Sequence, residues 1–386
     1  MNATIVSPRL LVVGGGAVRE APGVLAKLGV KHPLIVTDPF IRNSGMLALV
    51  TKPLDAAGVR WDVFSETVSD PTDTVIEAGV AKLAGGGFDG LIAVGGGSPI
   101  DTAKGMAILA KGGGKMRDYK VPVAADRADL PIVAIPTTAG TGSEVTRFTV
   151  VNDTSNDEKM LIAGIGCLPA AALVDYELTL GLPRSMTGAT GMDAITHALE
   201  AFVSKKANPY SDQMAKAALG FLARNIRTAF ERPDDRKARE GMMVGATFAG
   251  LAFSNSSVAL VHGMARPIGA FFHVHHGTSI AMLLPAVTAY SAQAAPQKYA
   301  EAARAMGVAG AEADDRAAIE RLVLELRALN AELGIPSPKA HGIDAARWSE
   351  LLPTMAEQAI ASGSPANNPR VAAAAEIVDL YRQAWA

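Results

Sequence analysis

The first half of the chain alternates short apolar runs, rich in β-branched residues, with longer stretches of helical periodicity. Apolar runs this short predict strands buried on both faces of a sheet, with helices between them. The alternation therefore predicts a doubly wound α/β domain. The predicted strands are Leu10–Val13, Leu34–Thr37, Leu91–Val94 and Ile132–Ile135, and the clearest helices among them are Val18–Leu28 and Thr74–Leu83.

The pattern changes beyond Met186, where β-branched runs fade and Ala, Leu and Met dominate. Helical spacing is plainest from Arg316 to Leu333, where apolar residues recur every three or four positions before a glycine and a proline end the pattern. We place the boundary at Leu182–Pro183, because proline ends the last α/β connection. The prediction is an α/β domain over residues 1–183 and a helical, metal-binding and catalytic domain over residues 184–386.

Composition narrows the possible partners. The 386 residues are 49% hydrophobic and 19% charged, which is typical of a globular chain and excludes extensive disorder. A net charge of −2 gives no electrostatic reason to expect nucleic acid or an anionic membrane as a partner. We therefore expect a small-molecule partner.

Cysteine usage and hydropathy point to the cytoplasm. The single cysteine, Cys167, cannot form an internal disulfide, which fits a reducing compartment and leaves no thiolate cluster for zinc or iron–sulfur. The N-terminus has no basic segment followed by an apolar core, so we expect no signal peptide. The longest apolar stretch, Met243–Phe253, is about half the ~20 residues that a membrane-spanning helix needs.

Four residues in the second half carry ligand-type side chains at suggestive spacings. In a helix, Asp193 and His197 share a face because they are four residues apart. His262 and His276, each followed by glycine, could complete a set of one carboxylate and three imidazoles for a divalent first-row metal. Alone, the helical pair could equally be a surface pair or a core histidine.

A glycine triplet follows the strand at residues 91–94 and opens a helix. Gly95, Gly96 and Gly97 would let the backbone approach a pyrophosphate, and the N–H groups of the following helix would attract its charge. The segment departs from the six-position Rossmann fingerprint because Ile100 occupies the place of its last glycine. The triplet indicates a phosphate-binding loop without proving one.

Two further strand ends could contact a dinucleotide. Asp38 ends the strand at residues 34–37, where a carboxylate can bind ribose hydroxyls and repel a 2′-phosphate, which predicts NAD over NADP. The alternative is a turn aspartate before Pro39. The loop over residues 136–144 is dense in hydroxyls and glycine and could wrap phosphates or ribose, or be only a polar turn.

These motifs together closely resemble the iron-containing (group III) alcohol dehydrogenases. The resemblance rests on the segments at residues 95–101, 136–144, 191–197 and 262–276, and on Asn368-Pro369-Arg370 before the last helix. It implies a Rossmann-like α/β domain and an all-α domain in a dehydroquinate synthase-like architecture. It also implies NAD(P) and a divalent metal in the cleft between the domains, and a homodimer or larger homo-oligomer.

The resemblance assigns roles to individual residues. It implies that the metal ligands are Asp193, His197, His262 and His276, and that the substrate pocket includes Phe148, Val150 and Phe253. The implied cofactor contacts are Asp38, Gly95, Gly96, Gly97, Ser98, Asp101, Thr137, Thr138, Thr141 and Lys159.

The chain departs from the family pattern at several positions. Arg266 stands where many relatives carry a further histidine, and it could either bind an anionic substrate tail or pair with a carboxylate such as Glu200. His273 is either a wall residue or a proton relay, and His275 is interpreted as incidental. Asp70 replaces an asparagine common in relatives.

The expected reaction is hydride transfer between an alcohol and NAD, with the metal as Lewis acid. The ligand set suits iron(II), zinc, nickel or manganese; the family name favours iron, with zinc as the alternative. A hydroxyacid, semialdehyde or maleylacetate-type reductase is the alternative on the same fold, although a metal-free reductase would not need the complete ligand set. A dehydroquinate-synthase-like lyase would need more basic residues in the motif region. A non-catalytic NAD-binding protein would be expected to carry a defective ligand set.

Overall fold

A computed structural model describes residues 2–128, 130–156 and 158–386. The chain divides into two compact units, Val6–Gly181 and Leu182–Ala386, and the second also includes residues 2–5. The first unit contains a parallel sheet and the second is helical, which confirms the predicted combination of an α/β domain with an all-α domain.

The α/β unit is built on a six-stranded parallel sheet in the order β1-β8-β5-β4-β2-β3. The four strands predicted from apolar runs are β1, β2, β4 and β5, with ends that shift by no more than one residue. The strand bounds are β1 Leu10–Val13, β2 Pro33–Val36, β3 Asp62–Phe64, β4 Gly90–Gly95, β5 Ile132–Pro136 and β8 Ala171–Val174.

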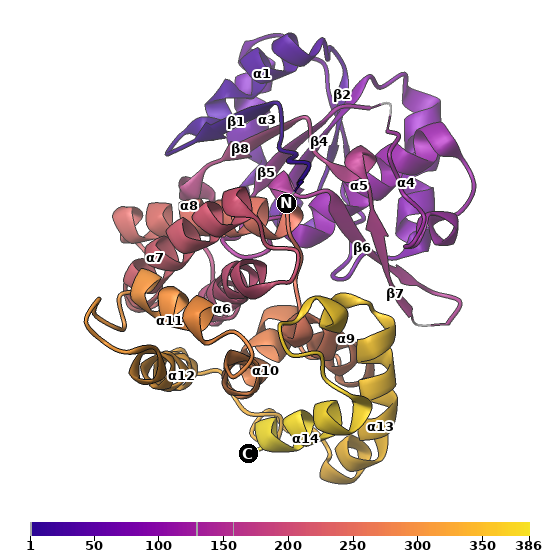
Figure 1. The fold of residues 1–386 in the computed structure, drawn as a ribbon. Helices are drawn as coiled ribbons and strands as arrows, with labels where there is room; N and C mark the ends of the chain where they lie inside the picture. Colours follow the sequence, from indigo (N-terminus) through magenta and orange to yellow (C-terminus); the bar gives the residue numbers. More distant parts are fainter. Residues whose placement is uncertain (1, 129, 157) are drawn as a thin grey trace. The chain divides into compact units, whose positions relative to one another are not determined.

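Helices cover both faces of this sheet, as Figure 1 shows. Successive residues of a strand point to opposite faces, so Leu91 packs into one apolar cluster and Ile92 into the other. The first cluster includes side chains of the helices α4 (Asp73–Gly86) and α5 (Gly97–Gly112). The second includes side chains of α1 and α3, and the shorter helix α2 follows β2. The bounds of these three helices are Ala21–Leu28, Pro39–Asn43 and Leu47–Ala56.

A two-stranded antiparallel sheet, β6 (Phe148–Asp153) and β7 (Glu158–Ala163), follows the loop after β5. Burial alternates along β6, so Phe148 and Val150 share its less buried face while Val151 faces the core. This hairpin was not predicted from the sequence.

The helical unit is organised around α6, which packs against α7, α8 and α10. Nearly every residue of α6 after its first turn is buried, so its ionisable side chains lie in an apolar interior. The α-helices of this unit are α6 Arg184–Val203, α7 Pro209–Glu231, α8 Arg236–Ser254, α9 Leu260–Phe272, α10 His276–Ala292, α11 Pro296–Ala305, α12 Asp315–Glu332, α13 Ala345–Ala361 and α14 Ala374–Ala384. In the described part of the chain, none of the helices combines the length and apolarity required to cross a bilayer.

Candidate functional site

Three acidic or imidazole side chains lie on one face of α6. Asp193, His197 and Glu200 follow one another at steps of four and three residues, the spacing that keeps side chains on the same face of a helix. All three are buried. A buried charge is costly unless it is paired or bound to a metal, so this face of α6 needs polar partners.

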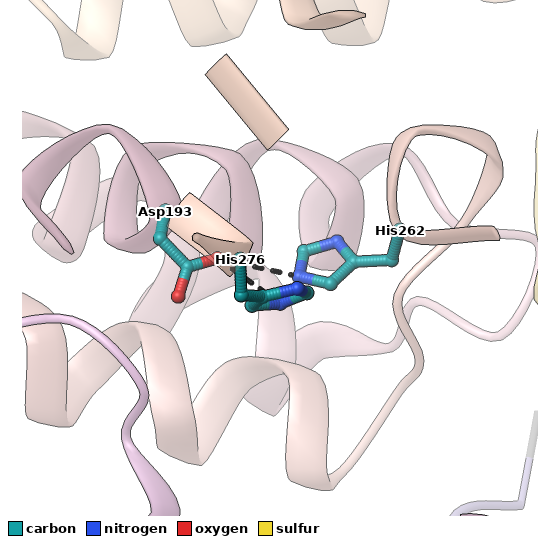
Figure 2. A group of neighbouring side chains, drawn as sticks. All are labelled: Asp193, His262 and His276. Atoms are coloured by element: carbon teal, nitrogen blue, oxygen red, sulfur yellow. Dashed lines mark ion pairs between the residues drawn. The ribbon is translucent and has the colours of Figure 1, made fainter. Parts of the chain in front are cut away.

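The partners come from α9 and α10. His262 lies in the first turn of α9 and His276 is the first residue of α10. The Nε2 atoms of His262 and His276 lie 3.5 and 3.9 Å from Asp193 Oδ1, and Figure 2 shows the three side chains directed toward one another. One ligand-type atom from each residue falls within 4.8 Å of the others.

His197 lies against the same group without joining this closest set. Its Nδ1 is 3.7 Å from Asp193 Oδ1. Its ring stacks between Phe253 and His262, with ring centroids 4.3 and 4.4 Å away. The structure therefore brings all four predicted ligand residues together, with three of them closest.

The donor set fits a divalent cation. Asp193 Oδ1 and His262 Nε2 are buried and form no hydrogen bond of normal geometry with any described residue. Such atoms are costly in a protein interior, and both are the atoms that face the centre of the group. A carboxylate with three imidazoles is a suitable set for iron(II), zinc or manganese.

Glu200 holds the other side of the His262 ring. Its Oε2 accepts hydrogen bonds from His262 Nδ1 at 2.7 Å and from the Ala259 N–H at 2.8 Å. Its Oε1 accepts one from the Val261 N–H at 2.6 Å. One carboxylate thus bonds to both the N-terminus of α9 and the histidine that α9 carries.

The charges of this group perturb one another. Burial raises the pKa of Asp193, but the neighbouring imidazoles outweigh burial and hold that pKa well below its ordinary value. Burial lowers the pKa of His262, but the carboxylates of Asp193 and Glu200 outweigh burial and raise it. Asp193 is therefore an anion at neutral pH, as a metal ligand must be.

The glycine loop before α5 fits the close approach of a backbone. Gly95 has φ +148°, a conformation that L side chains rarely adopt, and a Cβ there would lie 2.5 Å from Pro99 Cγ. A Cβ on Gly97 would lie 3.1 Å from Thr141 Cγ2. No described side chain caps the N-terminus of α5, so its first N–H groups are suited to an anion such as a pyrophosphate.

The carboxylate of Asp101 is hydrogen-bonded to other residues of the α/β unit. Its Oδ1 accepts a hydrogen bond from Ser143 Oγ at 2.6 Å, and its Oδ2 accepts one from the Val150 N–H at 3.0 Å. The Nζ of Lys104, which is fully buried, lies 3.9 Å from the same carboxylate. Burial raises the pKa of Asp101 and lowers that of Lys104, and each partner opposes the shift of the other.

The remaining predicted cofactor residues have structural contacts of their own. Asp38 caps α2, because its Oδ1 accepts a hydrogen bond from the Ile41 N–H at 2.8 Å, the role proposed by the turn alternative. Lys159 Nζ forms an ion pair with Asp70 at 3.0 Å. Thr137 donates its backbone N–H to Gly95 O. Thr138 and Thr141 flank the glycine loop, and Ser98 lies in the first turn of α5.

The predicted pocket residues belong to both units. Phe148 and Val150 lie on β6, and Phe253, near the end of α8, stacks on His197. Arg266, one turn after His262 in α9, donates to Ser364 Oγ at 3.1 Å. Burial lowers the pKa of Arg266, and the nearby Glu200 opposes this.

His273 ends α9 in the left-handed conformation, with φ 54°, and is exposed. A non-glycine residue in this region is uncommon, although histidine is among the side chains that tolerate it better. Its place at the helix end leaves its ring accessible to water.

Sequence reasoning missed two ionisable residues of these clusters. Glu200 was considered only as a partner for Arg266, although its spacing from Asp193 and His197 places it on the ligand face. Lys104 was not singled out, although it follows Asp101 by one helical turn.

Comparison with known proteins assigns the chain to a family. A model of the C-terminal part of the Fe-containing alcohol dehydrogenase family matches residues 187–385, and a model named iron-containing alcohol dehydrogenase matches residues 8–176.

Individual relatives match over nearly the whole chain. An NAD-dependent methanol dehydrogenase of Bacillus methanolicus is 35% identical over 98% of both chains. A lactaldehyde reductase of Escherichia coli (strain K12) is 36% identical over 96% of this chain and 97% of that protein. A crystal structure of a 1,3-propanediol oxidoreductase superposes with a TM-score of 0.95 at 35% identity, covering 100% of both chains.

Proposed function

The chain belongs to the iron-containing alcohol dehydrogenase family, and on that premise we propose that it is a metal-activated enzyme that uses NAD. Membership makes it an oxidoreductase that interconverts alcohols and aldehydes with a nicotinamide cofactor. The proposal adds the metal ligands, the cofactor preference and the substrate class.

The cluster of ligand residues carries the proposal. Asp193, His197, His262 and His276 would hold the metal, since their side chains converge and the inward atoms Asp193 Oδ1 and His262 Nε2 form no hydrogen bond within the described chain. When bound, a divalent metal supplies Lewis acidity, which lowers the pKa of an alcohol oxygen or polarises an aldehyde carbonyl. The donor set suits both iron(II) and zinc. Iron(II) is the metal we propose, because the family is named for iron, and zinc is the alternative.

The surrounding residues prepare the site. Asp193 contributes the negative charge that offsets part of the metal's charge, and its low pKa keeps it ionised. Phe253 covers one face of His197 and keeps water away from that side. His273, exposed three residues before His276, would exchange the alcohol proton with water.

The α/β unit would bind the cofactor. The uncapped N-terminus of α5 and the glycines before it would hold the pyrophosphate, with Thr138 and Thr141 beside them. Asp38 would meet the adenosine ribose and repel a 2′-phosphate, which supports NAD over NADP. Lys159 and Asp101 complete the proposed contacts.

The proposed substrate is a small neutral primary alcohol or diol, or the matching aldehyde. Arg266 supports this choice, because its guanidinium bonds to Ser364 and lies near Glu200, so it is already engaged within the protein. Phe148, Val150 and Phe253, which the family resemblance assigns to the substrate, are apolar. We also propose a homodimer or larger homo-oligomer, which the molar mass measured by light scattering would test.

Reconstitution tests the proposal directly. The protein would be stripped with a chelator, reloaded with iron(II) without oxygen, or with zinc, and assayed by NADH absorbance with primary alcohols, diols and hydroxyacids. We expect stripping to abolish turnover, reloading to restore it, and NAD to be preferred to NADP. Full activity in demonstrably metal-free protein would refute the metal role.

A further inference from the structure

Glu200 touches His262 on the side of the ring that faces away from Asp193. His262 Nε2 points to Asp193 Oδ1 at 3.5 Å, whereas Nδ1 points to Glu200 Oε2 at 2.7 Å. A histidine can bind a metal through one ring nitrogen only if that nitrogen carries no proton. The proton of a neutral His262 must therefore sit on Nδ1.

A carboxylate at position 200 enforces this arrangement. Its two oxygens accept hydrogen bonds from the N–H groups of Ala259 and Val261, so both oxygens face donors from the backbone. An ionised carboxylate offers only acceptors, and a ring nitrogen beside it must be the donor. Glu200 is 3% exposed, so water does not compete strongly for these bonds.

We infer that Glu200 is a positioning residue that fixes the orientation and tautomer of His262 and thereby strengthens metal binding. This inference rests on the proposed metal site. Outer-shell carboxylates bound to ligand histidines typically contribute 10- to 100-fold in metal affinity or activity. Here the same side chain also bonds to the N-terminus of α9, so the position of His262 along the helix and the rotation of its ring are set together.

Glu200→Gln is the most informative substitution, because it keeps the shape of the side chain and replaces one acceptor oxygen with an NH2 donor. If its oxygen faces Ala259 and His262, its NH2 group meets the donating Val261 N–H. If the amide is reversed, the NH2 group meets both the Ala259 N–H and His262 Nδ1, and the ring must place its proton on Nε2. The first orientation loses the hydrogen bond to the Val261 N–H of α9. In the second, Nε2 carries the proton and can no longer bind a metal.

The test measures metal affinity and needs no turnover. Chelator-stripped protein would be titrated with cobalt(II) against a chromophoric chelator. We expect Glu200→Gln to raise the cobalt(II) Kd about 10- to 100-fold and to shift the visible spectrum toward that of His262→Ala. In the His262→Ala background, Glu200→Gln should raise the Kd no further, because Glu200 acts through His262.

Asn367→Ala is the matched control. The Asn367 side chain donates to Ser257 Oγ at 2.8 Å and to Val258 O, in the segment just before α9, and these side-chain hydrogen bonds do not involve Glu200 or His262. It should lower the melting temperature while leaving the cobalt(II) Kd within twofold. An equal loss of affinity in this control would show that any loosening of the α9 entry is sufficient, and would overturn the inference.

Other outcomes separate the inference from the proposed function. A wild-type cobalt(II) Kd and spectrum in Glu200→Gln would overturn the inference and leave the metal site intact. Failure of the wild-type protein to bind one cobalt(II) per chain would overturn both. If Glu200→Gln does not fold, ¹⁵N-histidine NMR of the wild type decides, with His262 identified from His262→Ala. In the zinc-loaded protein, a proton on Nδ1 with none on Nε2 supports the inference, and a proton on Nε2 overturns it.

Discussion

Replacing Lys104 with methionine should destabilise the α/β unit strongly. The Nζ of Lys104 is fully buried and donates to Ser143 Oγ at 2.8 Å, Thr146 Oγ1 at 3.1 Å and Phe148 O at 2.7 Å. These three acceptors match the three N–H bonds of an ammonium group, which indicates that the buried side chain is charged although burial lowers its pKa. Methionine fills the space and removes all three donors.

The cost can be worked from the contacts that remain. Without Lys104, the carboxylate of Asp101 keeps Ser143 and Val150 but loses its nearby cation, and Phe148 O loses a partner. Breaking a buried charge pair from one side costs about 3–5 kcal/mol. For a unit of this length, about 2–4 °C of melting temperature corresponds to each kcal/mol, so the expected fall is about 6–20 °C.

The assay is thermal unfolding with NAD titration alongside. Lys104 joins α5, which begins at the glycine loop, to the segment containing Ser143, so the variant should also raise the NAD Kd. Lys104→Met with Asp101→Asn should recover part of the loss, because the carboxylate is then neutral. A loss of less than about 1 kcal/mol in the free energy of unfolding of Lys104→Met would refute the reasoning. So would a double variant that is no more stable than Lys104→Met.

Three further substitutions test the proposed site. His262→Ala should lower kcat/KM at least about 100-fold, since Lewis acid activation is worth several kcal/mol. NADH fluorescence titration should show unchanged cofactor affinity. Near-normal turnover would show that His262 is not a metal ligand. Asp38→Gly should improve kcat/KM with NADP roughly fivefold, as expected from removing about 1 kcal/mol of repulsion; wild-type preference for NADP would contradict this. Arg266→Lys should lower the melting temperature and reduce turnover of neutral alcohols and hydroxyacids alike. The reason is the lost hydrogen bond to Ser364, which is worth about 1.5–3 kcal/mol. A KM defect confined to hydroxyacids would instead assign Arg266 to the substrate.

The strands that the sequence predicted are those with strong apolar runs. Ile132–Ile135 and the core of β4 are wholly apolar and buried, and each contains β-branched residues. The strand β8 was missed because Ala171-Ala172-Leu173-Val174 is short and alanine-rich, and only pairing with β1 and β5 makes it a strand. The pairing of β6 with β7 likewise depends on contacts that local patterns do not specify.

Ligand residues were easier to predict than the residues that support them. A metal restricts its ligands to few side-chain types, and the four-residue step of Asp193 and His197 is visible in one dimension. Glu200 depends on where α9 begins, since two of its three hydrogen bonds go to the backbone there. Lys104 resembles a surface lysine in sequence, and only the backbone of β6 at Phe148 shows that it is enclosed.

Unequal burial of the ligand residues indicates which side of the metal would meet the substrate. The side chains of Asp193 and His262 are 3% and 5% exposed, whereas that of His276 is 38% exposed. A catalytic metal keeps one coordination position open to water or substrate. Glu200 bonds to the other ring nitrogen of His262, and Phe253 stacks on His197, so both of these rings have protein neighbours beyond the ligand group. Substrate would therefore reach a bound metal most readily from the side of His276, and His273, which is exposed three residues earlier in the chain, would exchange the proton with water.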